Sequence, residues 1–235
     1  MDIGIVVATP TEMKALDNAF KSSSWKQSID GMNVRIYRLD EHRIYAVESG
    51  AGEIKAAAAT QLLITGCCCR LIANFGVCGA LAPDMPVGQP AIVLSAVHYD
   101  RDVSAVDNCK PAMYEEFGSI HIPATPHLVN AAIASAPLYP VACASGDRFI
   151  DGAKAKRAMY LTYGTEICDM EAAGILLTAN RAGVPALLIK AVSDGSTGGA
   201  NDYWNTVDRV AANCAETLLT VLRNWRANEK GEVND

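Results

Sequence analysis

An α/β fold, with a central β-sheet flanked by helices, is the architecture that this sequence predicts, and three observations predict it. Strand-like apolar runs alternate with helix-like segments along the chain, as in sheets that carry helices on both faces. Half of the 235 residues are hydrophobic and one fifth are charged, which is ordinary for a globular protein. No repeat or linker divides the chain, so we expect one domain over residues 1–226 and a polar tail over residues 227–235.

The strands are predicted from two apolar patterns. Residues 33–39 and 43–48 alternate apolar and polar side chains and are rich in β-branched and aromatic types, which is typical of a hairpin. The other strands are short, continuous apolar runs, as expected of buried strands. They cover residues 3–8, 70–75, 91–97, 140–144 and 185–192.

The predicted helices lie between these strands, and two of them are rich in alanine and leucine. Residues 99–122 have little periodicity, so we expect them to be irregular. Ligands of such sheets bind beyond the strand ends, so chemistry is expected just after each strand. The helices cover residues 10–20, 52–66, 126–136, 152–163, 170–182 and 202–226.

Charge and hydropathy exclude several classes of partner. The formal net charge of −6 argues against a nucleic acid or an anionic membrane surface, which would favour a basic face. No apolar run approaches the roughly 18 residues that a membrane span needs. The N-terminus has no basic region before its apolar run, so we expect a first strand there and no signal peptide.

Cysteine and histidine usage argues against disulfide and metal chemistry. The eight cysteines form no Cys-x-x-Cys pair and lie mostly in apolar runs, so we expect reduced, buried thiols in a cytosolic protein. The four histidines are scattered, and none forms a His-x-x-x-His spacing. We therefore expect no metal ion, and nothing in the sequence indicates another cofactor.

Glu12 directly follows the first predicted strand, and its local pattern has two interpretations. Thr9, Pro10 and Glu12 have the spacing of a capping box with proline at the first helical position. A helix N-terminus also stabilises an ionised carboxylate, which would suit a base. The two roles are compatible only if the side chain turns towards the cleft.

Further segments at predicted strand ends contain glycine or an aromatic residue. Residues 49–52 and 74–80 each contain two glycines, which allow a ligand or another part of the backbone to approach closely. Residues 145–150 include Phe149, whose flat ring offers a surface for a base. Plain turns explain these segments equally well.

Two acidic residues complete the set. Glu171 opens the apolar helix 170–182, where a carboxylate commonly stabilises the helix dipole. That helix must be buried, so Glu171 is expected at a core edge, where it can accept hydrogen bonds from ribose hydroxyls. Asp194 is expected on a loop after the most apolar strand, where partial burial would raise its pKa and suit an acid. A turn or a helix cap is the alternative for Asp194.

Taken in order, six segments resemble the purine nucleoside phosphorylase/uridine phosphorylase superfamily, most closely its 5′-methylthioadenosine/S-adenosylhomocysteine nucleosidase branch. The resemblance extends from residue 1 to about residue 222, and the order and spacing of the segments make it specific. It implies a three-layer fold with a central twisted mixed sheet flanked by helices, usually as a homodimer. The segments are residues 3–12, 49–52, 74–79, 145–150, 170–172 and 193–194.

The resemblance also implies a purine nucleoside as substrate, cleaved between base and ribose. Asp194 would protonate N7 of the purine, and Glu12 would position and deprotonate the attacking water. Negative charge builds on the base and positive charge on the ribose, so we expect Asp194 to be protonated and Glu12 to be ionised. The implied substrate-binding positions are Glu171 and Met170 at the ribose, Phe149 and Ile150 at the base, and Ser193, Ala51, Gly79 and Val77 around them.

Several positions depart from that branch and leave the 5′ substituent of the nucleoside open. Val77 stands where the nucleosidases place a serine near the nucleophile, and Lys190 stands for an arginine. Thr9 and Ala51 replace larger apolar residues that line the pocket, and residues 99–122 diverge most.

Three alternatives to a nucleosidase remain open. A phosphorylase needs several arginines around phosphate, but Asn74 stands where one of them lies. A futalosine-type hydrolase shares residues 8–10 and Trp204, although its members tend to have asparagine at the position of Asp194. A nucleoside-binding module without turnover is the third alternative, and Val77 is the feature that favours it.

Overall fold

A ten-stranded mixed sheet forms the centre of the computed structural model, which describes residues 1–20 and 24–229. The continuous apolar runs become central strands because both of their faces are covered, and the last strand is buried at every position. The strands are β1 (Asp2–Val7), β2 (Trp25–Ile29), β3 (Met32–Leu39), β4 (His42–Glu48), β5 (Leu71–Ala80), β6 (Pro90–His98), β7 (Ile122–Pro123), β8 (Tyr139–Ser145), β9 (Ile167–Asp169) and β10 (Ala186–Asp194).

Part of the sheet closes on itself. The strand order is β10-β6-β8-β9-β5-β1-β4-β3-β2, with β7 paired to β6 and an additional pairing of β10 with β5. This additional pairing closes β5, β10, β6, β8 and β9 into a ring. Because β1, β5 and β10 run parallel, their carboxyl ends meet at one edge of the sheet.

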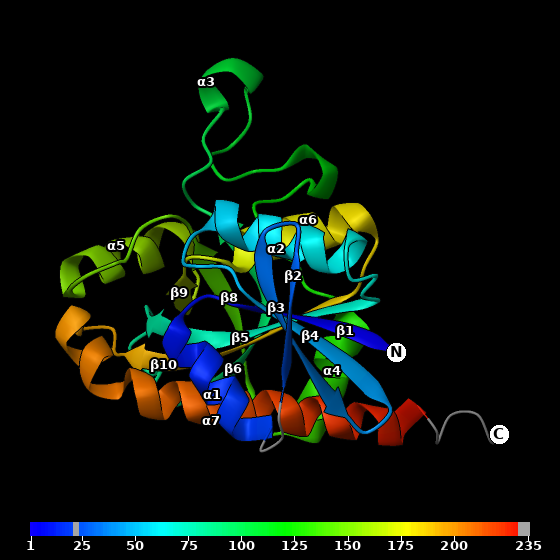
Figure 1. Cartoon of the computed structure of the whole chain (residues 1–235). Coiled ribbons are helices and arrows are strands. Elements are labelled where there is room, and N and C mark those ends of the chain that lie inside the picture. Colours follow the sequence, from blue (N-terminus) through cyan, green and yellow to red (C-terminus); the bar gives the residue numbers. More distant parts are fainter. Residues whose placement is uncertain (21–23, 230–235) are drawn as a thin grey trace.

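Helices cover the sheet in two layers. One layer pairs α2 with α6, and the other pairs α1 with α7, with α4 packed beside α7 (Figure 1). The helices are α1 (Pro10–Phe20), α2 (Glu53–Thr65), α3 (Ser104–Asp107), α4 (Pro126–Ser135), α5 (Ala153–Tyr163), α6 (Ala172–Ala182) and α7 (Ala200–Glu229), with a 3₁₀ turn at Glu115–Phe117.

The predicted α/β fold with a central mixed sheet between helices is confirmed, and every predicted strand and helix is present. Three strands were not predicted, for physical reasons. β2 is polar and largely exposed, and β7 and β9 contain only two and three residues. Residues 99–122 are irregular apart from α3, the 3₁₀ turn and the start of β7. Of the predicted polar tail, residues 227–229 continue α7, and residues 230–235 lie outside the described residues.

Three predicted element boundaries near the carboxyl edge are corrected. Asp194 is the last residue of β10 rather than part of a loop, because it still pairs with Gly79 of β5. Glu171 is the N-cap of α6 and precedes the first helical turn. Gly76 and Gly79 lie inside β5 rather than beyond it, because β5 continues along β10 and β9.

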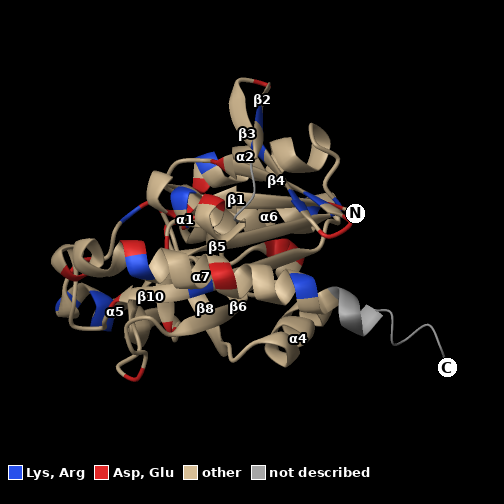
Figure 2. Cartoon of the chain, turned by 60° about the horizontal axis from the view of Figure 1, so that its bottom comes forward, with Lys and Arg blue, Asp and Glu red and all other residues tan. Residues whose placement is uncertain are grey.

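Other sequence expectations can be compared with the described residues. All eight cysteines are free thiols, and six of them are buried. Among the described helices, none combines the length and apolar character that a membrane crossing requires. Lysine and arginine residues are interspersed with acidic residues over the chain (Figure 2).

Candidate active site

One pocket at the carboxyl edge of the sheet is lined by all ten residues that the sequence singled out. Residues of β5, β9 and β10 line it, together with the segments that follow β1, β4, β8 and β9. The ten residues are Glu12, Ala51, Val77, Gly79, Phe149, Ile150, Met170, Glu171, Ser193 and Asp194. The structure therefore brings together six segments that are distant in the sequence.

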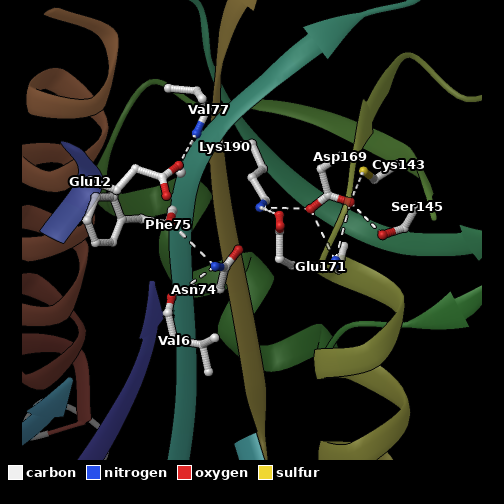
Figure 3. A network of polar contacts seen from close by, with 12 residues as sticks. Val6, Glu12, Asn74, Phe75, Val77, Cys143, Ser145, Asp169, Glu171 and Lys190 are labelled. Carbon is white, nitrogen blue, oxygen red and sulfur yellow. Dashed lines mark hydrogen bonds and ion pairs between the residues drawn. The ribbon is translucent and has the colours of Figure 1, made fainter. Parts of the chain in front are cut away.

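Glu12 both caps α1 and faces the pocket. Its Oε2 accepts hydrogen bonds from the Thr9 N–H and the Thr9 hydroxyl, both at 3.0 Å, and the Glu12 N–H donates to Thr9 Oγ1 at 3.3 Å. This is the predicted capping box. Its Oε1 accepts the Val77 N–H at 2.9 Å, which turns the carboxyl group towards β5 (Figure 3). The two interpretations of Glu12 are thus geometrically compatible.

Gly76 and Gly79 explain how two carboxyl groups approach the central strand so closely. A Cβ atom at Gly76 would collide with Oε1 of Glu12. A Cβ atom at Gly79 would lie 3.3 Å from Oδ2 of Asp194 and 3.0 Å from Sγ of Cys168, which is tighter than most Cβ contacts. The two glycines therefore provide the close approach that the sequence indicated.

Asp194 is buried, and both of its carboxylate oxygens have partners. Ser193 Oγ donates to Oδ1 at 2.7 Å, and Lys156 Nζ forms an ion pair with Oδ2. Lys156 reaches the pair from α5 and was not predicted. The prediction for Asp194 considered burial alone and did not include a buried ammonium group beside the carboxylate.

Lys190 pairs with a second group of carboxylates (Figure 3). Its Nζ lies 2.7 Å from Oδ2 of Asp169 and 3.8 Å from Oε2 of Glu171. Asp169 also accepts a 2.5 Å hydrogen bond from the hydroxyl of Ser145. Glu171 accepts the Gly52 N–H at 3.2 Å, which ties it to the turn before α2.

Burial raises the pKa values of several of these acids. Desolvation raises the pKa of Glu171 to about 7, although the charge of Lys190 opposes the shift. Desolvation also raises the pKa of Glu12, against Lys190 and the hydrogen bonds from Val77 and Thr9. Asp169 differs: burial would raise its pKa, but the charge and hydrogen bonds of Lys190 and Ser145 lower it. Lys190 thus keeps the pKa of Asp169 low, whereas burial raises the pKa values of Glu12 and Glu171.

Glu53 joins the same network from behind the pocket. It accepts hydrogen bonds from the Ser145 hydroxyl and the Gly174 N–H. Burial, and then the charge of Asp169, raise its pKa to about 8. Glu53 was not predicted, because an acidic residue in the first turn of a helix is usually explained by the helix dipole.

An aromatic wall stands at the pocket mouth. Phe149 is 47% exposed and meets Tyr203 edge-to-face, with ring centroids 5.8 Å apart. Tyr203, in the first turn of α7, was also missed, although an aromatic residue just after the glycine-rich loop 195–199 was a usable signal. Ile150 and Met170 add apolar surface beside it. Such a wall suits a flat, partly apolar ligand.

The arrangement can perform acid–base chemistry on a ligand that carries both a flat ring and hydroxyl groups. Glu12 and Asp194 lie in the same pocket, each held by hydrogen bonds to fixed donors. Glu171 adds a carboxylate that can accept hydroxyl donors. Among the described residues, no cluster of His, Cys, Asp and Glu could hold a metal ion.

The fold and pocket define a class: α/β proteins that bind small ligands at the carboxyl ends of parallel strands. A model of the phosphorylase superfamily matches residues 2–224, so the chain belongs to that superfamily.

Curated relatives of the chain are nucleosidases. The 5′-methylthioadenosine/S-adenosylhomocysteine nucleosidase of Shewanella piezotolerans is 27% identical over 236 residues, which cover 95% of this chain and 99% of the relative. The enzyme of the same name from Shewanella putrefaciens is 30% identical over 203 residues, which cover 83% of this chain and 87% of the relative.

Solved structures share the fold at lower sequence identity. A futalosine hydrolase mutant of Helicobacter pylori has a TM-score of 0.88 and 21% identity, covering 94% of this chain and 98% of its own. The S. pneumoniae 5′-methylthioadenosine/S-adenosylhomocysteine nucleosidase with a transition-state inhibitor has a TM-score of 0.86 and 23% identity, covering 95% of this chain and 99% of its own.

Glu53→Gln is expected to flatten the pH dependence of stability. Folding raises the pKa of Glu53 from 4.5 to about 8. The folded state therefore binds this proton more tightly, and the free energy of unfolding falls as the pH rises through that interval. Glutamine removes this loss. Urea unfolding at several pH values measures the slope, with Glu48→Gln on the exposed end of β4 as the control. An equal slope in the Glu53 variant and the wild type would contradict the prediction.

Proposed function

We propose that the chain hydrolyses the N-glycosidic bond of an adenine nucleoside of the 5′-methylthioadenosine or S-adenosylhomocysteine type and releases adenine. The observation that carries the proposal is the placement of Glu12, Asp194 and Glu171 in one pocket. Membership of the superfamily and the names of the relatives support it.

Five residues of the pocket have roles at the base and the ribose in this reaction. Asp194 faces N7 of the purine and passes a proton to the departing base, an effect of about 10²–10⁴-fold for general acids. Phe149 stacks on the base, and Ile150 presents its backbone to the base edge. Glu171 accepts hydrogen bonds from the ribose hydroxyls, and Met170 packs against the sugar.

Glu12 activates the nucleophile. Hydrogen bonds from Thr9 and Val77 fix its carboxylate, so that a water placed against it loses a proton as it attacks the sugar. Positive charge develops on the ribose at the same time, and the nearby carboxylates stabilise it. The Val77 side chain offers no hydroxyl to the water, but the hydroxyl of Thr9 lies in the pocket beside Glu12.

The charge of the pocket favours water over phosphate as nucleophile. Four carboxyl groups line it, from Glu12, Asp169, Glu171 and Asp194, against one guanidinium group, that of Arg148. The Arg148 side chain is 70% exposed and lies 3.6 Å from a carboxylate of Asp100. A phosphate dianion needs several converging cationic donors. Asn74 stands where a phosphorylase has one of its arginines. Its side chain donates to the Val6 carbonyl at 3.0 Å and does not line the pocket.

Futalosine is the second candidate substrate. The likeness to a solved futalosine hydrolase supports it, as does Trp204, which is 72% exposed beside Tyr203 near the pocket mouth. An indole ring there could pack against a bulky 5′ substituent. Asp194 favours adenine as the leaving group, because N7 of adenine requires a proton donor.

Purified protein should release adenine from 5′-methylthioadenosine in phosphate-free buffer. Chromatography of the products, with and without phosphate and with futalosine in parallel, measures the reaction. A strict requirement for phosphate would identify a phosphorylase, and release of hypoxanthine from futalosine alone would identify the second candidate. Binding without turnover would indicate a nucleoside-binding module and reject hydrolysis.

Asp194→Asn is expected to lower kcat for adenine release by at least ~10², since the amide cannot transfer a proton. Glu12→Gln is expected to fold but hydrolyse poorly, because an amide can neither take the water proton nor accept at both positions. Steady-state kinetics and urea unfolding check both variants. Near-wild-type activity of Asp194→Asn would exclude Asp194 as the general acid. If Glu12→Gln stays active but is about 1 kcal/mol less stable, Glu12 acts only as the cap of α1.

We also propose that this enzyme acts in the cytoplasm, in methionine salvage.

A separate proposal is that two copies of the chain form a homodimer. Ile54 on α2 and Val106 on α3 are each 81% exposed, and the segment with α3 projects beyond α2 (Figure 1). Exposed apolar side chains of this size are commonly covered by a partner. Light scattering should give the dimer mass for the wild type and a lower mass for Ile54→Glu; a wild-type monomer would reject the dimer.

A further inference from the structure

Lys156 is the single buried residue of α5, a helix that otherwise lies near or at the surface. Its side chain is fully inaccessible to solvent. Nζ donates to Oδ2 of Asp194, to the carbonyl of Gly195 at 2.7 Å and to the carbonyl of Asp194 at 3.3 Å. An ammonium group has three hydrogens to donate, and each has an acceptor here. The site therefore holds lysine in its charged form against one carboxylate.

This geometry decides which of the two groups, Lys156 or Asp194, carries the proton that they share. Asp194 accepts from Ser193 at Oδ1 and from Lys156 at Oδ2, so both oxygens act as acceptors. A proton added to Asp194 would leave an uncompensated cation in a buried site, which is unfavourable. Lys156 and Asp194 together therefore hold one transferable proton, and that proton resides on the lysine.

We propose that Lys156 supplies, through Asp194, the proton that the departing purine takes. The inference rests on the proposed function and adds to it a residue that acts through the acid rather than on the substrate. Lys156 does not line the pocket, so it is a positioning and proton-supplying residue.

The proposed step balances in protons and charge. As the bond between C1′ of the ribose and N9 of the purine breaks, its electron pair moves to the base. A proton passes from Lys156 Nζ to Asp194 and from Asp194 to N7 of the base. The water oxygen bonds to C1′, and its proton goes to Glu12. Lys156 ends neutral and Glu12 ends neutral, so the total charge is unchanged. Release of the Glu12 proton to solvent and uptake of one by Lys156 restore the site.

Other titratable and charged groups face this pair from the surrounding elements. Burial raises the pKa of the Cys168 thiol on β9 to about 12, and burial also raises the pKa of the Tyr203 phenol on α7, so neither gains charge near neutral pH. Glu12, Asp169 and Glu171 line the same pocket, Lys190 pairs with Asp169, and all four are common to wild type and variants. A ratio of variant to wild type at each pH therefore isolates the contribution of Lys156.

The test compares Lys156→Met with the wild type and with Lys154→Met, an exposed lysine of the same helix. kcat/KM for adenine release from 5′-methylthioadenosine is measured across the pH range. The wild type and Lys154→Met should keep their activity far above the pH at which a lone carboxyl group ionises. In Lys156→Met the proton must come from Asp194 alone. Its kcat/KM should therefore fall about tenfold per pH unit above the pH at which a lone carboxyl group ionises, and should stay near the wild-type value below that pH.

The outcomes separate the inference from the proposed function. A wild type that releases no adenine at any pH overturns both. A wild type that is active, with Lys156→Met parallel to it at every pH, overturns the inference alone and leaves the lysine a structural role. If circular dichroism shows that Lys156→Met does not fold, the pH profile of the wild type alone tests the inference. Activity that persists into the alkaline range supports the lysine as the proton source, and a fall with an ordinary carboxyl pKa overturns it.

Discussion

The site depends on one constraint: the central strand β5 must be free of side chains where two carboxyl groups lie against it. Gly76 admits Glu12, and Gly79 admits Asp194 together with Lys156. β5 pairs in parallel with β1 and β10, so Glu12, which follows β1, and Asp194, the last residue of β10, reach β5 from two different neighbouring strands. A side chain at Gly76 would displace the carboxyl group of Glu12, and one at Gly79 would crowd Cys168 and Asp194, so the positions of both carboxyl groups depend on these glycines.

Buried charge is the second organising feature. Among the described residues, five carboxyl groups are buried with two lysines, Lys156 and Lys190. The five are Glu12, Glu53, Asp169, Glu171 and Asp194. Cations are fewer than acids, so protons take the place of the missing positive charge, and burial raises the pKa of Glu171 to about 7 and that of Glu53 to about 8. The carboxyl groups that stay ionised stabilise a ligand that becomes positive, and the small number of cationic donors leaves a dianion without partners.

Each of the two lysines pairs with a different carboxylate that lines the pocket. Lys190 holds Asp169 and lies near Glu171 on the side that we assign to the ribose. Lys156 holds Asp194 on the side that we assign to the base. In a low-dielectric site each ion pair fixes the orientation of its carboxylate at a cost in desolvation. In the proposed reaction, this arrangement would supply a proton at one end of the scissile bond and negative charge at the other.

The sequence by itself determined the order of strands and helices and the ten residues of the pocket. The elements follow from local patterns, because continuous apolar runs must be buried. The ten residues follow from the family resemblance carried by the order and spacing of six segments, since the local pattern alone explains Glu12 and Asp194 equally well as a cap or a turn. The sequence did not reveal β2, whose side chains are exposed, or β9, which is too short to show a period.

Only the tertiary structure decided the closing of β10 onto β5 and the burial of Lys156 and Glu53. A lysine in a helix ordinarily indicates a solvated face, and a glutamate in a first turn ordinarily indicates a helix dipole. Whether such a charge is solvated or buried depends on partners that lie distant in the sequence: Asp194 is 38 residues from Lys156, and Gly174 is 121 residues from Glu53. The folded chain alone brings those partners within hydrogen-bonding distance, and no local pattern encodes that proximity.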